Sequence, residues 1–242
     1  MITKRPTPWL IKDALTAIVV PLLFQLGYYL TVGVALRFRL MPDFANAFFR
    51  SESSLLRLSE YGIALLSEVI VLVWLVAKRH ATRRDLGLTR FRWQWLFIVF
   101  GLYGLQLIMI FALYAILQTL IPSINLDETQ EVFEFGLSHW GIIFSFIATV
   151  LVAPIIEEVI FRGLIFPALA TRWRMWIAAM ISSAIFALMH GQLNVGIYTF
   201  VFGILLCWMY QRSGSIIPGI VLHFMNNLIA FWALASVGAH LL

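Results

Sequence analysis

The sequence predicts an all-α protein, a polytopic membrane helical bundle of about seven transmembrane helices, with six to eight as the range. Three observations support this prediction: 62% of the 242 residues are hydrophobic, only 12% are charged, and the apolar residues form long runs. An ordinary soluble domain has about a quarter charged residues, so lipid is expected to be the main solvent of this chain. We expect one integral membrane domain over residues 1–242.

Seven apolar runs are long enough, or nearly long enough, to cross a bilayer, which takes about 20 residues of helix. Backbone groups in lipid must be hydrogen-bonded within their own segment, and the runs lack the short alternating pattern of a membrane barrel, so each is expected to be helical. The predicted spans are residues 15–36, 61–77, 95–121, 140–162, 175–190, 195–210 and 216–239. Residues 37–60, between the first two spans, are expected to hold an interfacial amphipathic helix.

The basic residues predict an orientation and not a nucleic-acid partner. The formal net charge is +5, but lysine and arginine lie in the short segments between apolar runs, most densely in KRHATRRDLGLTRFR at 78–92. Loops of this kind stay in the cytoplasm, which places the N-terminus there and the C-terminus outside. The acidic residues expected outside are Asp127, Glu128, Glu131 and Glu134. The compact length and the lack of a eukaryotic sorting signal favour a bacterial inner membrane.

Few ionisable residues fall inside the predicted spans, and each costs about 2.5 to 3.5 kcal/mol on insertion scales. The fourth span contains Glu157, Glu158 and Arg162, the fifth His190, the seventh His223 and Asn227, and the second Glu68. Residues placed at such a cost require an explanation.

The two adjacent glutamates face different directions. Glu158 and Arg162 are i,i+4 neighbours in the order that favours an ion pair, whereas Glu157 points about 100° away and has no local counter-charge. A carboxylate in that position is typical of a general base. Pro154, one turn upstream, frees a backbone carbonyl and can bend the helix.

His223 and Asn227 share one helix face because they too are four residues apart. Asn226 points elsewhere and is expected to pack or to hydrogen-bond between helices. The same spacing relates Phe186 to His190, so the aromatic ring can shield the imidazole from lipid.

Each residue also has a purely structural explanation. A single histidine in a membrane more often hydrogen-bonds between helices than acts in catalysis, and Glu158 with Arg162 is most simply a structural pair. Glu68 is more simply a protonated or hydrogen-bonded interhelical residue than part of a polar cavity. Taken together, however, a base, two imidazoles and a carboxamide supply what water needs to attack an amide and what stabilises the oxyanion.

Three segments resemble the motifs of a known family. EEVIFR at 157–162, FALMH at 186–190 and HFMNN at 223–227 resemble, in order and spacing, the motifs of the CAAX protease and bacteriocin-processing (CPBP, or Abi) family. The similarity covers residues 148–229, the expected catalytic core. Weaker similarity lies in RDLGL at 84–88 and RSGSIIPGI at 212–220.

The resemblance implies an intramembrane endopeptidase that hydrolyses a peptide bond of a membrane-associated peptide or protein. By this resemblance, Glu157 with His190 activates a water molecule, and His223 with Asn227 holds the oxyanion. Glu158, Arg162 and Phe186 support them. The alternative function is a non-catalytic membrane scaffold or bacteriocin-immunity protein that regulates a partner; a transporter is disfavoured because no inverted repeat is visible.

The choice between a metal-free and a zinc mechanism stays open at the level of sequence. Glu157, His190 and His223 would make a plausible zinc set with an open position for water. Neither an HExxH motif nor a thiolate cluster supports zinc, since Cys207 is the single cysteine. We therefore expect a glutamate-type enzyme with no cofactor, and we keep zinc as the alternative.

Helical rise reveals a mismatch in depth. Glu157 lies roughly 8 Å from Arg162, the expected cytoplasmic end of its span, and His223 lies roughly 10 Å from Ile216, whereas His190 lies roughly 24 Å from Arg174. If these residues meet, we expect the fifth span to be strongly tilted or its first turns to lie in the interface.

Overall fold

The computed structural model describes residues 7–38, 54–124 and 139–238, and these residues form helices and connecting turns without a strand. Six of the helical elements are α1 (Ile11–Arg37), α3 (Ser54–Arg79), α4 (Gln94–Leu120), α8 (Met175–Leu188), α9 (Leu193–Ser213) and α10 (Ile217–Gly238). A seventh, continuous rod consists of α5 (His139–Ser145), η1 (Phe146–Val152), α6 (Ala153–Ile160), η2 (Phe161–Ile165) and α7 (Phe166–Ala170). The predicted all-α bundle is confirmed.

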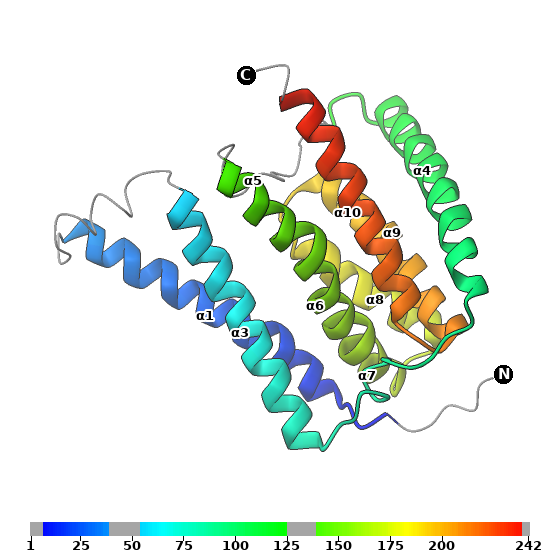
Figure 1. The fold of residues 1–242 in the computed structure, drawn as a ribbon, viewed down its shortest axis with the longest axis horizontal. Helices are drawn as coiled ribbons and strands as arrows, with labels where there is room; N and C mark the ends of the chain where they lie inside the picture. Colours follow the sequence, from blue (N-terminus) through cyan, green and yellow to red (C-terminus); the bar gives the residue numbers. More distant parts are fainter. Residues whose placement is uncertain (1–6, 39–53, 125–138, 239–242) are drawn as a thin grey trace.

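Five of the described helical rods are long and apolar enough to cross a membrane, and α8 and α10 supply two shorter apolar helices. Successive rods run in opposite directions, so the basic segments gather at one end of the molecule (Figure 1). This alternation is the one that the loop charges predicted. The side of the membrane on which that end lies stays a prediction.

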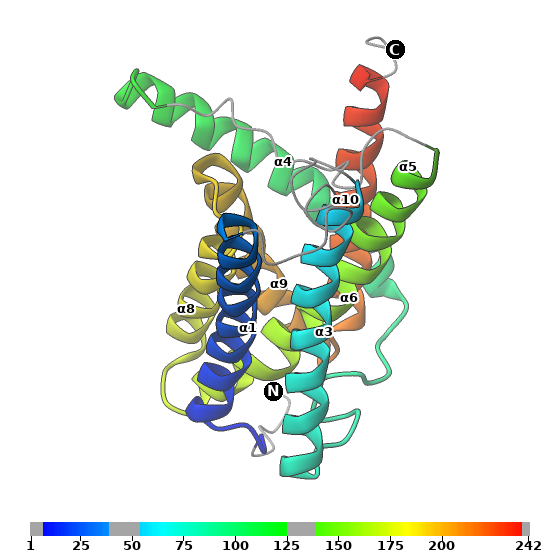
Figure 2. The same cartoon turned by 90° about the vertical axis from the view of Figure 1, so that its left-hand side faces the viewer.

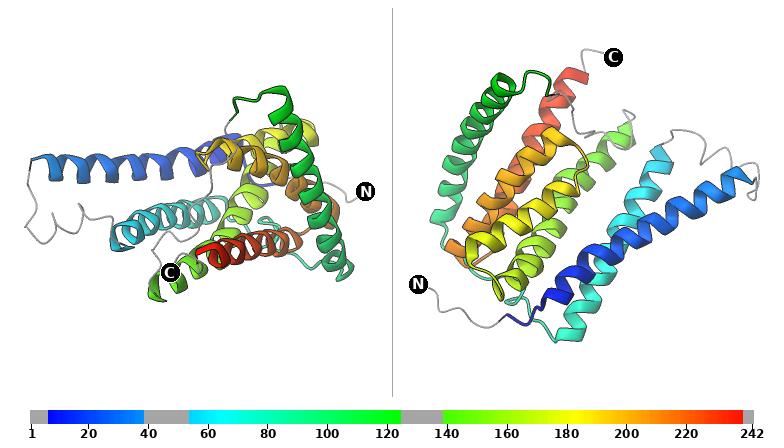
Figure 3. Two further views of the ribbon diagram at one scale, coloured as in Figure 1. Left: turned by 90° about the horizontal axis from the view of Figure 1, so that it is seen from above. Right: turned by 180° about the vertical axis from the view of Figure 1, so that it is seen from behind.

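The helices form two groups around the rod α5–α7. On one side α1 and α3 pack against each other, and on the other α8, α9 and α10 pack closely together with α4 outside them (Figures 1 and 3). The quarter turn in Figure 2 shows α4 leaning away from the other helices. The rod therefore lies in the middle of the bundle.

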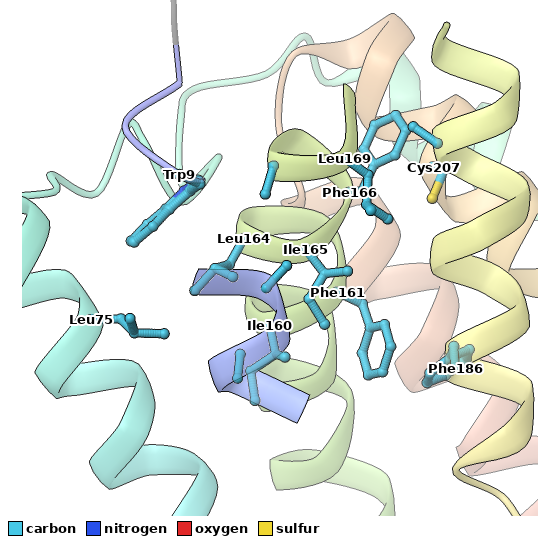
Figure 4. Packing of buried hydrophobic residues seen from close by; sticks show 14 of the residues in the cluster. Trp9, Leu75, Ile160, Phe161, Leu164, Ile165, Phe166, Leu169, Phe186 and Cys207 are labelled. Atoms are coloured by element: carbon cyan, nitrogen blue, oxygen red, sulfur yellow. The ribbon is translucent and has the colours of Figure 1, made fainter. Parts of the chain in front are cut away.

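The main hydrophobic core lies where the lower half of the rod meets α1 and α8. Leu164, Ile165 and Phe166 are almost fully buried there and pack near Phe186 of α8 and Trp9 (Figure 4). Because η2 and most of α7 are buried, their sequence is apolar around the helix apart from Arg162, and not along one stripe.

The rod extends farther than the sequence predicted. The fourth span was expected to end at Arg162, but helical structure continues to Ala170. Arg162 could be mistaken for an end because a charge usually marks one, whereas here it is neutralised inside the bundle. The extension places Glu157 about 20 Å from the end of the rod at 1.5 Å per residue, against roughly 10 Å for His223 in α10, yet His223 Nε2 lies 3.6 Å from Glu157 Oε2. Helical rise counted from a helix end therefore does not give the relative depth of these residues.

The basic loop 80–93 is docked against the turn between α9 and α10. Thr89 Oγ1 donates to the Gly214 carbonyl at 2.6 Å, Ser215 Oγ donates to the Thr89 carbonyl at 2.8 Å, and the Ile216 amide donates to the Gly87 carbonyl at 3.0 Å. Gly87 has a φ of 72°, and a Cβ there would lie 2.8 Å from Ile216. The two segments with weaker family similarity therefore contact each other.

The same end is held to α1 by an ion pair. Asp13 is buried, accepts from the Leu10 amide at the start of α1, and receives Arg79 Nε and Nη2 at 2.8 and 3.0 Å. This pair ties the first turn of α1 to the last turn of α3.

One predicted helix boundary is wrong, and two predictions concern residues that the structure does not describe. Helix α3 begins at Ser54, seven residues before the predicted start, so residues 54–60 belong to it and not to a separate interfacial helix. The rest of that expected helix, residues 39–53, lies outside the described residues, as do the acidic residues Asp127, Glu128, Glu131 and Glu134.

Candidate active site

The site is built on the middle of the rod, where the helix changes its hydrogen-bond register twice. The short α-helix α6 lies between the π-helical segments η1 and η2 and contains Pro154, Glu157 and Glu158. Such π-segments occur frequently at functional sites because they redirect side chains and release backbone groups. Pro154 was predicted to free a backbone carbonyl, and it lies just after the π-helical segment η1, in which the hydrogen-bond pattern differs from that of an α-helix.

Glu158 and Arg162 form the predicted ion pair, and it is completely enclosed. Arg162 Nη1 lies 2.9 Å from Glu158 Oε1, and the two side chains are 1% and 0% exposed. The guanidinium also lies 4.6 Å from the centre of the Phe186 ring. A buried pair of this kind is costly to assemble and still more costly to break.

Two glycines make room for the pair. A Cβ on Gly219 would lie 3.1 Å from Glu158 Oε2, and a Cβ on Gly203 would lie 2.7 Å from Ser183 Oγ and 3.2 Å from Arg162 Nη2. The backbones of α9 and α10 therefore approach the charged groups as closely as a residue without a side chain permits.

His223 lies between the two glutamates. Its Nδ1 is 3.2 Å from Glu158 Oε1, and its Nε2 is 3.6 Å from Glu157 Oε2. His223 is buried, whereas the Glu157 side chain is 29% exposed. The geometry therefore separates the two carboxylates: Glu158 holds the imidazole in place from inside, and Glu157 faces the more open side.

The second imidazole, His190, reaches the same neighbourhood through Phe186. Its Nδ1 lies 2.8 Å from the Phe186 carbonyl oxygen, and its ring meets the Phe186 ring edge-on at 4.8 Å. Phe186 is buried and also meets the His223 ring edge-on, at 6.0 Å. Phe186 thus contacts both imidazoles, as well as Phe161 of the rod (Figure 4).

Asn227 is bonded on both sides of its carboxamide. Its Nδ2 donates to the Thr149 carbonyl of η1 at 2.8 Å, and its Oδ1 accepts from Asn226 Nδ2 at 3.1 Å. The Tyr198 hydroxyl of α9 donates to Asn226 Oδ1. The prediction that Asn226 hydrogen-bonds between helices is confirmed.

Glu68 of α3 is not isolated from the site. Its partly buried carboxylate interacts electrostatically with Glu157, which brings the second predicted span into the neighbourhood of the motif residues. The sequence could not show this proximity, because Glu68 belongs to none of the three motifs.

The described residues include no group of three histidine, cysteine, aspartate or glutamate side chains placed to hold a metal ion. Of the alternative zinc set, Glu157 and His223 are adjacent, whereas the contacts of His190 are with Phe186. Cys207 is buried and belongs to the core beside α8. Whether the reaction uses a metal stays a prediction.

Sequence reasoning missed several neutral polar residues that the structure buries. Tyr198 and the Thr149 carbonyl take part in the hydrogen bonds around Asn227, and Gln106 is 2% exposed in the otherwise apolar α4. Ser182 and Ser183 are buried, and Ser183 lies near Arg162 beside Gly203. An amide in the apolar run 95–121 was a signal for Gln106, but the other residues are too common in membrane helices to attract notice.

Comparison with known proteins identifies the same part of the chain. Residues 139–229 match the family model described as type II CAAX prenyl endopeptidase Rce1-like. These residues comprise the rod, α8, α9 and the first half of α10, and they contain all three motifs.

One curated relative, named "Putative membrane peptidase YdiL", comes from Bacillus subtilis (strain 168). It is 36% identical over 81 residues, which amounts to 34% of this chain and 33% of the relative. The chain thus matches about a third of the length of that relative. No solved structure shows significant similarity to the chain.

Proposed function

The similarity to the CAAX protease family, predicted from three motifs, is confirmed by the family model, and from this premise we propose that the protein is an intramembrane endopeptidase. It hydrolyses a peptide bond of a membrane-associated peptide or protein by a glutamate-type, metal-independent mechanism. One observation carries the proposal: the partly exposed Glu157 lies beside an imidazole whose other nitrogen is held by a buried, ion-paired glutamate. A polar cluster with a purely structural role would need only the buried Glu158–Arg162 ion pair.

The hydrogen bonds of the two histidines give them different roles. The Phe186 carbonyl can only accept, so His190 Nδ1 carries a hydrogen and the neutral ring presents an unprotonated Nε2. That nitrogen can assist Glu157 in taking a proton from water. His223 Nδ1–H donates to Glu158, so its Nε2 also carries a hydrogen only when the ring is the imidazolium cation; in that form Nε2–H, on the Glu157 side, can donate to a reacting carbonyl oxygen.

The reaction proceeds as follows. Glu157 takes a proton from water, and the oxygen attacks the carbonyl carbon of the scissile bond. The negative charge on the carbonyl oxygen is stabilised by His223 Nε2–H and by the Asn227 hydrogen that is not donated to Thr149. The C–N bond then breaks, and Glu157 returns its proton to the leaving amine, leaving a carboxyl and an amino terminus as products.

The surroundings of the site define the substrate only by class. The motif residues lie on lipid-embedded helices, so the peptide must reach them from the membrane or its surface. We propose that the site opens toward the cytoplasmic half of a bacterial inner membrane, with the N-terminus and the basic end of the bundle in the cytoplasm. The net charge gives no reason to expect a nucleic-acid partner.

A comparison of membrane peptides tests the proposal. Cells that express wild type, Glu157→Gln, His190→Ala or His223→Ala are compared by mass spectrometry of their membrane peptides. His139→Ala serves as the control because His139 is exposed at the start of α5. We expect at least one cleavage product to disappear in all three site variants and to persist in the control.

Two outcomes would contradict the proposal. If the three site variants keep every product and full cellular function, the protein is a scaffold or immunity protein and not a protease. If a chelator abolishes the cleavage and zinc restores it, the protease stands and its metal-independent mechanism falls.

A further inference from the structure

A chain of hydrogen bonds crosses the bundle beside the proposed site and passes through Asn227. It begins at the Tyr198 hydroxyl in α9, continues through the two adjacent amides of Asn226 and Asn227 in α10, and ends at the Thr149 carbonyl in η1. None of these bonds is needed to bury the ion pair. The chain therefore needs another explanation.

The Thr149 carbonyl is available because of Pro154. In the π-register a carbonyl accepts from the amide five residues later, and the Ala153 amide donates to Ala148 in this way. The next acceptor, Thr149, would take the amide of residue 154, but proline has no N–H. Asn227 fills that position with its Nδ2 at 2.8 Å. The bent helix thus provides a specific anchor for one carboxamide.

The two bonds of Asn227 fix which end of its carboxamide points where. The Thr149 carbonyl only accepts, so Nδ2 must face it, and Oδ1 must face the donating Asn226 Nδ2. Rotating the amide by half a turn would place acceptor against acceptor at Thr149 and donor against donor at Asn226. The second hydrogen of Nδ2 therefore keeps one direction, as a donor to an oxyanion requires.

Tyr198 fixes the orientation of Asn226 in the same manner. Its hydroxyl donates to Asn226 Oδ1, so Asn226 Nδ2 is turned toward Asn227. The Tyr198 ring stacks on Phe202 at 5.9 Å, and Phe202 meets the His223 ring edge-on at 5.3 Å. Tyr198 thus contacts Asn226, which is bonded to Asn227, and Phe202, which packs against His223; Asn227 and His223 are the two proposed oxyanion donors.

Helix α4 contributes Gln106 at the far end of the chain. Gln106 is 2% exposed, and its side chain lies next to the Tyr198 hydroxyl. An amide in the membrane interior is costly unless it is partnered, so its placement beside the tyrosine favours a role in holding that hydroxyl.

We propose that Tyr198 and Asn226, with Gln106 behind them, are positioning residues that hold the Asn227 carboxamide in its donating orientation. The inference rests on the proposed function, because it assigns Asn227 to the reacting oxygen. It predicts that the Tyr198 hydroxyl, as distinct from the ring that stacks on Phe202, acts on the reaction through Asn227 alone.

A double-mutant cycle tests this dependence. Purified protein in liposomes is given a synthetic peptide spanning the cleavage site found in the membrane comparison. Tyr198→Phe should lower kcat about fivefold to tenfold with little change in KM, since the lost bond matters only as charge develops. In an Asn227→Ala background, Tyr198→Phe should lower kcat no further. Asn226→Ala should behave like Tyr198→Phe in both backgrounds.

Tyr114→Phe is the matched control. Tyr114 donates its hydroxyl to the Asn194 carbonyl at 2.7 Å, another bond between two helices, and among the described residues it makes no hydrogen bond with Asn226 or Asn227. Its loss should affect thermal unfolding about as much as Tyr198→Phe and leave kcat unchanged. An equal fall of kcat in both variants, or a full multiplicative effect of Tyr198→Phe on Asn227→Ala, would overturn the proposal.

A spectroscopic measurement separates this inference from the proposed function. In protein labelled with ¹⁵N-asparagine, the side-chain amide signal of Asn227, assigned by its loss in Asn227→Ala, should shift in Tyr198→Phe and not in Tyr114→Phe. An unmoved signal would overturn the hydrogen-bond chain. If wild type cleaves nothing, the proposed function fails, while the Asn227 signal still decides the chain.

Discussion

The N-terminal helices and the C-terminal helices use the same apolar composition for different purposes. Of the residues in the apolar stretch of each helix, only 11% in α1 and 17% in α3 are buried within the protein. The corresponding shares are 33% in the rod α5–α7 and 44% in α9. The outer helices thus leave most of their apolar residues facing lipid, and the inner helices bury a larger share within the protein.

The difference coincides with where the chain resembles other proteins. The family match begins at residue 139 and ends at 229, so it covers the inner helices and omits α1, α3 and α4. Chemistry in a membrane needs polar groups held away from lipid, and among the described residues most of the buried polar side chains lie on the inner helices. All the spans are apolar, so hydropathy does not distinguish the helices of the proposed active site. The share of their residues that is buried within the protein does.

The largest expected difference between the two regions concerns their ion pairs. Arg162→Met leaves Glu158 buried without its counter-charge and should lower the free energy of unfolding by about 3–5 kcal/mol. Arg79→Met removes the outer pair with Asp13, whose arginine is 21% exposed and can be replaced by water, and should cost about 1–2 kcal/mol. Thermal unfolding in detergent, followed by tryptophan fluorescence, measures both. Equal losses would show that the inner pair is no more enclosed than the outer one.

Glycine substitutions test the same contrast at smaller magnitude. Gly203→Ala and Gly219→Ala press a methyl group against Ser183, Arg162 or Glu158 and should each cost about 1–3 kcal/mol. Gly104→Ala in α4 places the methyl group in open space and should be neutral or stabilising by up to about 1 kcal/mol. Denaturant titration in detergent compares the three. Destabilisation by Gly104→Ala as large as that of the inner variants would contradict the packing described.

The smallest expected effect on stability comes from Pro154→Ala. The new amide can donate to the Thr149 carbonyl and compete with Asn227, so stability should change by less than about 1 kcal/mol while kcat falls about threefold or more. Pro21→Ala in the outer helix α1 is the matched control and should leave kcat unchanged. A Pro154→Ala variant with full activity would show that Asn227 does not depend on the freed carbonyl.

The fold was largely predictable because hydropathy alone identifies spans. All seven predicted spans correspond to helices or helical rods of the described structure, with errors at their ends. One end was missed because a charged residue usually marks the end of a span. Arg162 looked like such an end, but Glu158, 0% exposed, neutralises it inside the bundle.

For the proposed site, spacing predicted the contacts within one helix and not the contacts between helices. Spacing indicated the Glu158–Arg162 pair and the shared face of His223 and Asn227, and the structure contains both the ion pair and the interhelical contacts of α10. Spacing could not show that His223 bridges both glutamates, since this depends on how α10 packs against the rod. Nor could it indicate Tyr198, because a neutral hydroxyl in a membrane helix carries no strong penalty that would mark it.

The rate at which purified Glu157→Gln cleaves the synthetic substrate peptide in liposomes tests the central claim most directly. Glutamine keeps the size of the side chain but cannot take a proton from water, so cleavage should fall by at least about a hundredfold while thermal unfolding stays within a few degrees of wild type. Cleavage at the wild-type rate by this folded variant would show that the Glu157 carboxylate is not the base.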